Sequence, residues 1–136
     1  MKNTDGLKNN WLFFGALFLF LAVAIGAFGA HGLTKFVSGK AMTTFKTGVT
    51  YQFYHGFALL FVGLCQSFSG PSGVGQSLKL KRAGAFFIAG ILLFSFNCYL
   101  YALTKVKAFA MVVPLGGLAF LVGWSFLLVS FYKRKA

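Results

Sequence analysis

The sequence of 136 residues is short of charge, and above all of negative charge. Lys and Arg together number 13, whereas Asp and Glu together number 1, at Asp5. One carboxylate excludes acid and base catalysis by paired carboxylates and leaves no ligand set for Mg²⁺ or Ca²⁺. It also excludes cation-coupled transport through a membrane carboxylate.

Cysteine, histidine and catalytic motifs are scarce as well. Cys65 and Cys98 fall deep within apolar segments, away from His31 and His55, so we expect neither a metal site nor a disulfide. The sequence contains no GxSxG, HExxH or P-loop pattern. We therefore expect a protein that is not an enzyme, with no catalytic residues and no cofactor.

What the sequence does contain is apolar. Hydrophobic residues make up 58% and charged residues 10%, where an ordinary soluble domain has roughly 25% charged residues. The basic residues fall between long uncharged segments, which is typical of loops that contact the anionic headgroups of membrane lipids. No motif for reading nucleic acid accompanies the positive charge, so we expect lipid and not nucleic acid as its partner.

Four uncharged windows are each long enough, at about 20 apolar residues, to cross a bilayer as a helix. The prediction is an all-α integral membrane four-helix bundle forming a single transmembrane domain, 1–136, with helices near 11–31, 51–69, 83–103 and 108–131. The first window exceeds the 7–15 apolar residues typical of a signal peptide, so we expect it to be retained. Residues 38–50 are predicted to extend the second helix for a short distance into the interface, with Ser38 as its cap.

The distribution of Lys and Arg predicts the topology. With four crossings, both tails and the middle loop share one side, and together they carry more basic residues than the other two loops. The positive-inside rule then places both termini in the cytoplasm.

Several polar side chains fall within or at the ends of the predicted spans. Tyr51 and Gln52 precede His55 by four and three residues, so these side chains share one side of a helix. The end of the third helix and the end of the first lie on the same side of the membrane as His55. We predict one polar cluster from these elements, made of His31, Tyr51, Gln52, His55, Asn97 and Tyr101.

This cluster has two interpretations. Histidine titrates between pH 5 and 8, so a proton-coupled role is physically possible. Alternatively the cluster is a static hydrogen-bond network in which His31 caps the first helix and His55 bonds its own helix.

Small residues predict where helices pack together in the membrane. Ala22, Gly26 and Ala30 recur every four residues in the first helix, and Gly116 and Gly123 lie seven apart in the fourth. Pro114 lacks an amide donor and is predicted to kink the fourth helix.

Four motifs together resemble a known family: GAFGAHGL (26–33), TGVTYQFYHGFALL (47–60), GILLFSFNCYLYAL (90–103) and PLGGLAFLVGW (114–124). They are similar to the domain of unknown function 423 family, the YgdD/YwdK-type small four-helix inner-membrane proteins of bacteria. The resemblance implies a multi-pass protein of the bacterial inner (plasma) membrane, but it brings no established activity. Its signature positions fall here on Gly29, Ala30, His31, Tyr51, Gln52, His55, Pro114, Gly116, Gly117 and Trp124. Asn97 and Cys98 depart from the family pattern, which commonly has Gly or Ser there.

Two functional hypotheses follow. The first is a non-enzymatic membrane protein that stabilises or modulates a membrane partner, a second copy of itself or the surrounding lipid. The second is a small permease or channel component whose polar path passes Tyr51, Gln52, His55 and His31.

Overall fold

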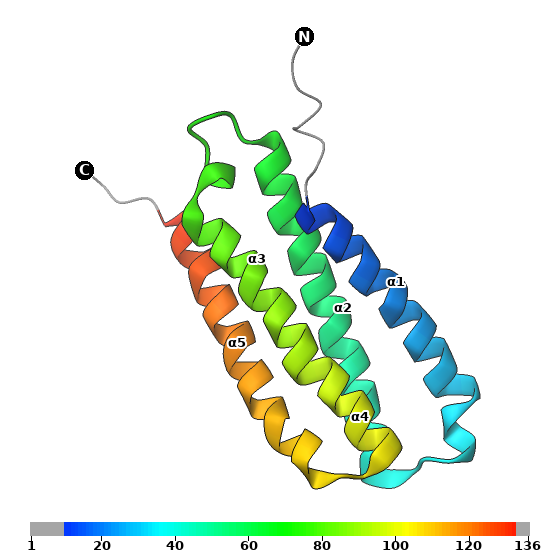
Figure 1. The fold of residues 1–136 in the computed structure, drawn as a ribbon. Helices are drawn as coiled ribbons and strands as arrows, with labels where there is room; N and C mark the ends of the chain where they lie inside the picture. The colour runs from blue at the N-terminus through cyan, green and yellow to red at the C-terminus, as the bar shows by residue number, and fades with distance from the viewer. Residues whose placement is uncertain (1–9, 133–136) are drawn as a thin grey trace.

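The computed structural model describes residues 10–132, and every regular element in that range is helical. The helices form four rods that lie side by side along the molecule (Figure 1). The all-α prediction is therefore confirmed. The elements are α1 (Asn10–His31), η2 (Leu33–Lys35), α2 (Gly39–Phe68), η3 (Val74–Gln76), α3 (Leu78–Gly90), η4 (Ile91–Ser95), α4 (Phe96–Thr104) and α5 (Lys107–Phe131).

The second helix is the longest element, because the predicted extension is continuous with it. Helix α2 has 30 residues, about 45 Å at 1.5 Å per residue, which exceeds the roughly 30 Å of a hydrocarbon core. Its early turns bury Ala41, Phe45 and Gly48, so packing carries the helix back to Gly39. Ser38 occupies the N-cap position with an extended backbone, but its side chain makes no capping hydrogen bond.

The third rod, α3–η4–α4, begins before its predicted start and contains an irregular turn. The Lys79 amide donates to Ser77 Oγ at 3.2 Å, and this cap starts α3 at Leu78 rather than at residue 83. The irregular turn is η4, which follows α3 directly. It is a π-helical turn, in which the Phe96 amide donates to the Ile91 carbonyl. The rod thus stays helical through the widened turn.

The four rods are arranged with α2 and the α3–α4 rod in the middle. Helix α2 packs against α1, α3, η4 and α4, whereas α5 packs against α3, η4 and α4. Helices α1 and α5 are therefore the outer helices on opposite flanks (Figure 1).

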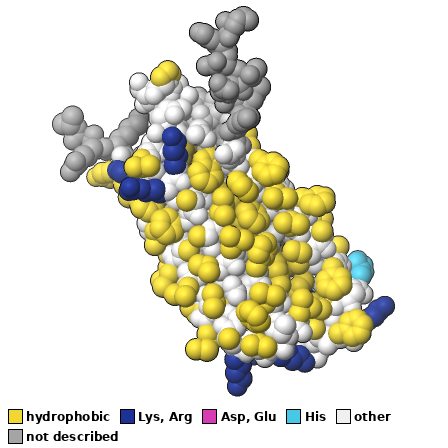
Figure 2. Space-filling view, in the orientation of Figure 1, with side chains coloured by type: hydrophobic (Ala, Val, Ile, Leu, Met, Phe, Trp, Pro, Cys, Tyr) yellow, Lys and Arg dark blue, Asp and Glu magenta, His cyan; other side chains and the backbone are white. Residues whose placement is uncertain are grey.

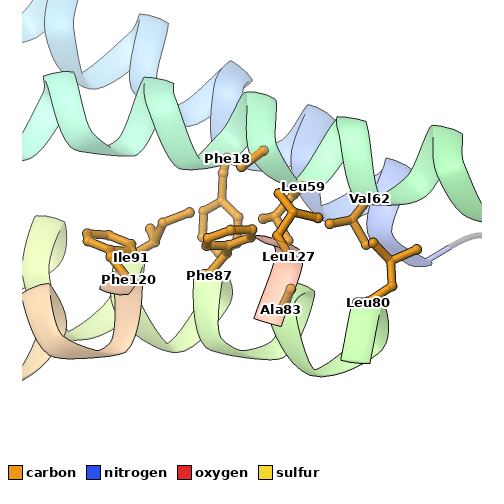
Figure 3. Packing of buried hydrophobic residues seen from close by; sticks show 10 residues of the cluster. Phe18, Leu59, Val62, Leu80, Ala83, Phe87, Ile91, Phe120 and Leu127 are labelled. Atoms are coloured by element: carbon orange, nitrogen blue, oxygen red, sulfur yellow. The ribbon is translucent and has the colours of Figure 1, made fainter. Parts of the chain in front are cut away.

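Two hydrophobic clusters fill the interior. In the larger one, Leu59 and Val62 of α2 point toward Phe87 and Leu80 of α3 (Figure 3). The smaller one packs η2 and the start of α2 against α4, through residues such as Leu33, Phe45 and Tyr99.

On the face drawn in Figure 2, the surface between the two ends of the molecule is mostly hydrophobic, and Lys and Arg side chains lie at both ends. Three helical stretches are long and apolar enough to cross a membrane, namely Asn10–Lys35, Leu78–Thr104 and Lys107–Phe131. Helix α2 falls short of that measure because Gln52, His55 and other polar residues lower its hydropathy. Both of these side chains are buried, so their polar atoms are shielded by the neighbouring helices.

Candidate functional site

His55 of α2 makes a hydrogen bond with each ring nitrogen. Its Nδ1 lies 2.7 Å from the Tyr51 carbonyl oxygen, and its Nε2 lies 3.0 Å from Trp124 Nε1 on α5. An indole N–H only donates and a carbonyl only accepts. The neutral imidazole with its proton on Nδ1 is therefore the form that satisfies both contacts, and it joins α2 to α5.

Aromatic rings surround this imidazole. The His55 ring stacks on Phe120 with centroids 3.5 Å apart and planes at 7°. The Phe120 ring fits against Gly90, where a side chain of any size would collide with it. Tyr51 in turn stacks on Phe94 at 4.5 Å, so rings from α2, η4 and α5 form one aromatic wall.

This wall lines a groove of about 770 Å³ between α2 and α5, which we call the aromatic groove. Its volume lies within the range of about 300–1,000 Å³ typical of small-molecule sites. At Gly117 an added Cβ would meet nothing within 4 Å, so the groove has open space on its α5 side. The lining residues are Tyr51, Tyr54, His55, Phe94, Pro114, Gly117, Leu118, Phe120, Leu121 and Trp124.

Gln52, one turn before His55, forms a second and separate polar site. Its amide donates to the Phe18 carbonyl of α1 at 2.8 Å, and its carbonyl accepts from the Tyr99 hydroxyl of α4 at 2.7 Å. Gln52 has no exposed surface. It therefore ties three helices together in a place that water and lipid do not reach.

The structure does not bring the six residues of the predicted cluster together. His31 is exposed at the end of α1. The residue of α1 that lies level with His55 is Leu19, which packs against Gly56, and Leu19 is twelve residues before His31. At 1.5 Å per residue, about 18 Å of helix separates the levels of the two histidines. The expectation that His31 approaches His55 is therefore wrong, because α1 and α2 are antiparallel and His55 lies well inside the α2 rod.

Asn97 and Tyr101 also lie apart from His55. The Asn97 amide donates to the Leu92 and Leu93 carbonyls at 3.2 and 2.9 Å, so it serves the π turn of its own rod and not the bundle interior. Tyr101 is partly buried near the end of α4, where its carbonyl accepts from the Lys105 amide at 2.7 Å. Of the predicted cluster, Tyr51 and His55 line the aromatic groove and Gln52 lies behind it.

The predicted packing residues are divided between the interior and the surface. Ala22 is buried and Gly26 faces Val49, but Ala30 is exposed and Gly29 takes the inward place against Phe45. A strict four-residue spacing gains 40° per step on a helix of 3.6 residues per turn, so Ala30 has turned away from α2.

In α5 the small residues do face neighbouring helices. Gly116 packs against the Phe94 backbone and Gly123 against the Phe87 ring. Pro114 is exposed, lines the aromatic groove and lies inside a helix that continues through it.

Sequence reasoning did not connect Gln52 and His55 to the three partners that define these sites, which are Tyr99, Phe120 and Trp124. The resemblance placed Trp124 among the signature positions, but no spacing rule connects it to His55 across 69 residues. Within residues 10–132, no group of three or more His, Cys, Asp or Glu side chains is placed to hold a metal ion.

These features define a class, an all-helical membrane protein with an apolar surface and basic ends. The model of the family described as Protein of unknown function (DUF423) matches residues 25–117. The chain is 37% identical to a UPF0382 membrane protein of Staphylococcus aureus (strain bovine RF122 / ET3-1) over 90% of this chain and 95% of that protein. The corresponding figures for UPF0382 membrane proteins of Staphylococcus haemolyticus and Staphylococcus epidermidis (strain ATCC 12228) are 37% and 39% identity over the same shares. The chain belongs to the DUF423 family, and no solved structure matches it.

Proposed function

We propose that this chain is a non-enzymatic membrane protein that modulates its lipid surroundings by holding a hydrocarbon chain in the aromatic groove. The observation that carries this proposal is a groove of about 770 Å³ whose wall is aromatic and aliphatic and whose central polar atoms are already paired.

The pairing of polar atoms favours hydrocarbon over a polar ligand. His55 and Trp124 satisfy each other, so neither needs a hydrogen bond from the occupant. The two tyrosine hydroxyls are the other polar side-chain groups among the lining residues. The groove also lies beside the middle turns of α5, the depth at which a spanning helix meets acyl chains.

The packing of the small residues of α5 favours lipid over a protein partner as the protein's target. Gly116 and Gly123 are occupied inside the chain by η4 and α3, so they offer no free face for a neighbouring helix. A homo-oligomer or a partner would have to use another surface.

The permease hypothesis receives less support. Its path requires continuity from His31 to His55, whereas about 18 Å of helix separates their levels and Gln52 between them is sealed.

We further propose that all four rods cross the bacterial inner membrane, with both termini in the cytoplasm. The described chain begins and ends at the same end of the molecule, which also holds the α2–α3 connection (Figure 1). The side chains of Gln52 and His55 on α2 are covered by other helices, as polar groups at membrane depth require. In a background without cysteine, a Cys at Ser72 should react with an impermeant thiol reagent only in inside-out vesicles, and a Cys at Lys105 only in right-side-out ones. The same sidedness at both positions would contradict four crossings.

The lipid proposal is tested by filling the groove. At Gly117 an added Cβ meets no atom of another helix within 4 Å, so Gly117→Leu places its side chain in the groove, and Ala24→Leu adds a leucine at an exposed position on α1. Native mass spectrometry of protein extracted from membranes in mild detergent should show bound lipid on the wild type and on Ala24→Leu, but much less on Gly117→Leu.

Two results would overturn the proposal. One is equal lipid retention by both variants, and the other is a wild-type protein that carries no lipid. Solute flux in proteoliposomes that is lost in His55→Ala would favour the permease instead, and crosslinking of a constant neighbour in native membranes would favour a protein partner.

A further inference from the structure

A second groove, of about 260 Å³, lies between α3 and α5 at the end of the molecule that holds the α2–α3 connection. We call it the basic groove, because Lys79 forms part of its rim. Its remaining lining residues are Val122, Ser125, Phe126 and Val129, all of α5. It is separate from the aromatic groove, which α2, η4 and α5 line with different residues.

Two cations stand together at this groove. Lys79 and Arg82 are three residues apart on α3, so their side chains are neighbours on one helix face. The Arg82 guanidinium carbon lies over the Phe126 ring, 5.9 Å from its centroid, which turns this side chain toward α5 as well. Both residues are exposed, so their charged groups are open to a ligand from outside the chain.

The protein itself supplies no anion for these cations among the residues that the structure describes. The single acidic residue, Asp5, lies outside residues 10–132. The one hydroxyl in the groove, Ser125 Oγ, donates to the Leu121 carbonyl at 2.8 Å and carries no charge. A guanidinium and an ammonium together match the oxygens of a phosphate group.

Below the cations the groove is apolar. Val122, Phe126 and Val129 recur at spacings of four and three, so they form a stripe along α5 that runs from the basic end toward the hydrophobic middle. A ligand that fits both parts has an anionic head and a hydrocarbon tail. We propose that the basic groove binds one anionic phospholipid, with its phosphate held by Lys79 and Arg82 and an acyl chain lying along α5.

The experiment compares two charge-matched double variants. Lys79→Gln/Arg82→Gln removes both cations of the groove, and Lys40→Gln/Lys107→Gln removes two exposed cations at the opposite end. Lys81→Gln serves as a local control, because position 81 is two residues from Lys79 and lies on another face of α3. Each protein is placed in mixed micelles with phosphatidylglycerol or phosphatidylcholine, and bound lipid is counted by native mass spectrometry.

The wild type, Lys81→Gln and Lys40→Gln/Lys107→Gln should prefer phosphatidylglycerol. Lys79→Gln/Arg82→Gln should lose roughly tenfold in that preference, since each Lys or Arg near an anionic headgroup contributes severalfold to binding. An equal preference for phosphatidylglycerol in both double variants would overturn the proposal. Inorganic phosphate or soluble glycerophosphoglycerol that competes as well as the intact lipid would show an anion site without the acyl groove, and would also overturn it. Thermal melting of each variant establishes that it is folded before lipid is counted.

Discussion

Gln52 and His55 lie one turn apart on α2 and face very different surroundings. Gln52 is sealed between α1 and α4, and both ends of its amide are bonded to them. His55 is bonded across to Trp124 on α5, beside a groove with open space at Gly117. One helix therefore carries a polar group that is wholly enclosed and another that borders an opening.

This difference separates structure from candidate function. A buried amide whose nitrogen and oxygen both bond inside the chain adds specificity to helix packing, and its burial keeps it out of reach of a ligand. The His55 ring, by contrast, forms part of the wall of the aromatic groove and so affects which ligands fit there. The predictions below test this division.

The largest expected effect concerns room for added side chains. At Gly48, one turn before Gln52, an added Cβ would lie 2.8 Å from Cys98 Cβ and 2.9 Å from the Tyr99 ring. Gly48→Leu should therefore reduce the free energy of unfolding by about 3 kcal/mol or more, because α2 and α4 would be forced apart. Gly117→Leu should leave it nearly unchanged. Denaturation by SDS in mild-detergent micelles measures both, and similar losses would contradict the difference in packing.

The next effect concerns the sealed amide. Gln52→Leu leaves the buried Tyr99 hydroxyl without its acceptor, and we expect a loss of about 1–3 kcal/mol in the free energy of unfolding. The same SDS titration measures it.

A companion variant separates the lost hydrogen bond from lost packing. Gln52→Leu/Tyr99→Phe removes the stranded hydroxyl as well, so it should be more stable than Gln52→Leu alone. If the double variant is less stable than the single one, the hydrogen bond is not the source of the cost.

A smaller effect is expected on the groove side. Trp124→Phe removes the indole donor to His55 but keeps an aromatic ring, and Trp124 is 44% exposed. The loss should be about 0.5–1 kcal/mol, less than for Gln52→Leu, because the freed His55 nitrogen borders an open groove. A loss larger than that of Gln52→Leu would reverse the comparison.

The smallest effect is expected at the other histidine. His31 is exposed at the end of α1, so His31→Ala should change the free energy of unfolding by no more than about 0.5 kcal/mol. It should also leave the lipid bound in the aromatic groove unchanged. Loss of that lipid in His31→Ala, measured by native mass spectrometry, would contradict the separation of His31 from His55 and support the single polar cluster predicted from the sequence.

The rods were predictable because each depends on a local property of the sequence. The ranges predicted for the first and last helices, 11–31 and 108–131, differ from α1 and α5 by one residue at the start and by none at the end. The start of α2 at Gly39 agrees with the predicted extension over residues 38–50, whereas the third rod begins at Leu78 and not near residue 83. The π turn had no visible signal, since Ile91–Ser95 reads as ordinary apolar helix.

The candidate sites were less predictable. Spacing along α2 identified Tyr51, Gln52 and His55, but it placed them on one polar face with a single purpose. In the fold, three residues of spacing are enough to direct Gln52 to α4 and His55 to α5. The partners Tyr99 and Trp124 lie 47 and 69 residues away, beyond the reach of any helical periodicity.

By itself, the sequence determined that this protein is a set of apolar helices with basic ends, because bilayer length and backbone hydrogen bonding allow little else for such uncharged runs. Only the tertiary structure decided which polar residue is sealed and which borders a groove. Helix packing sets that choice, since it depends on how rods far apart in the chain rotate and approach one another. Lipid tails are as apolar as the faces of the helices, so hydrophobicity alone does not select which faces meet.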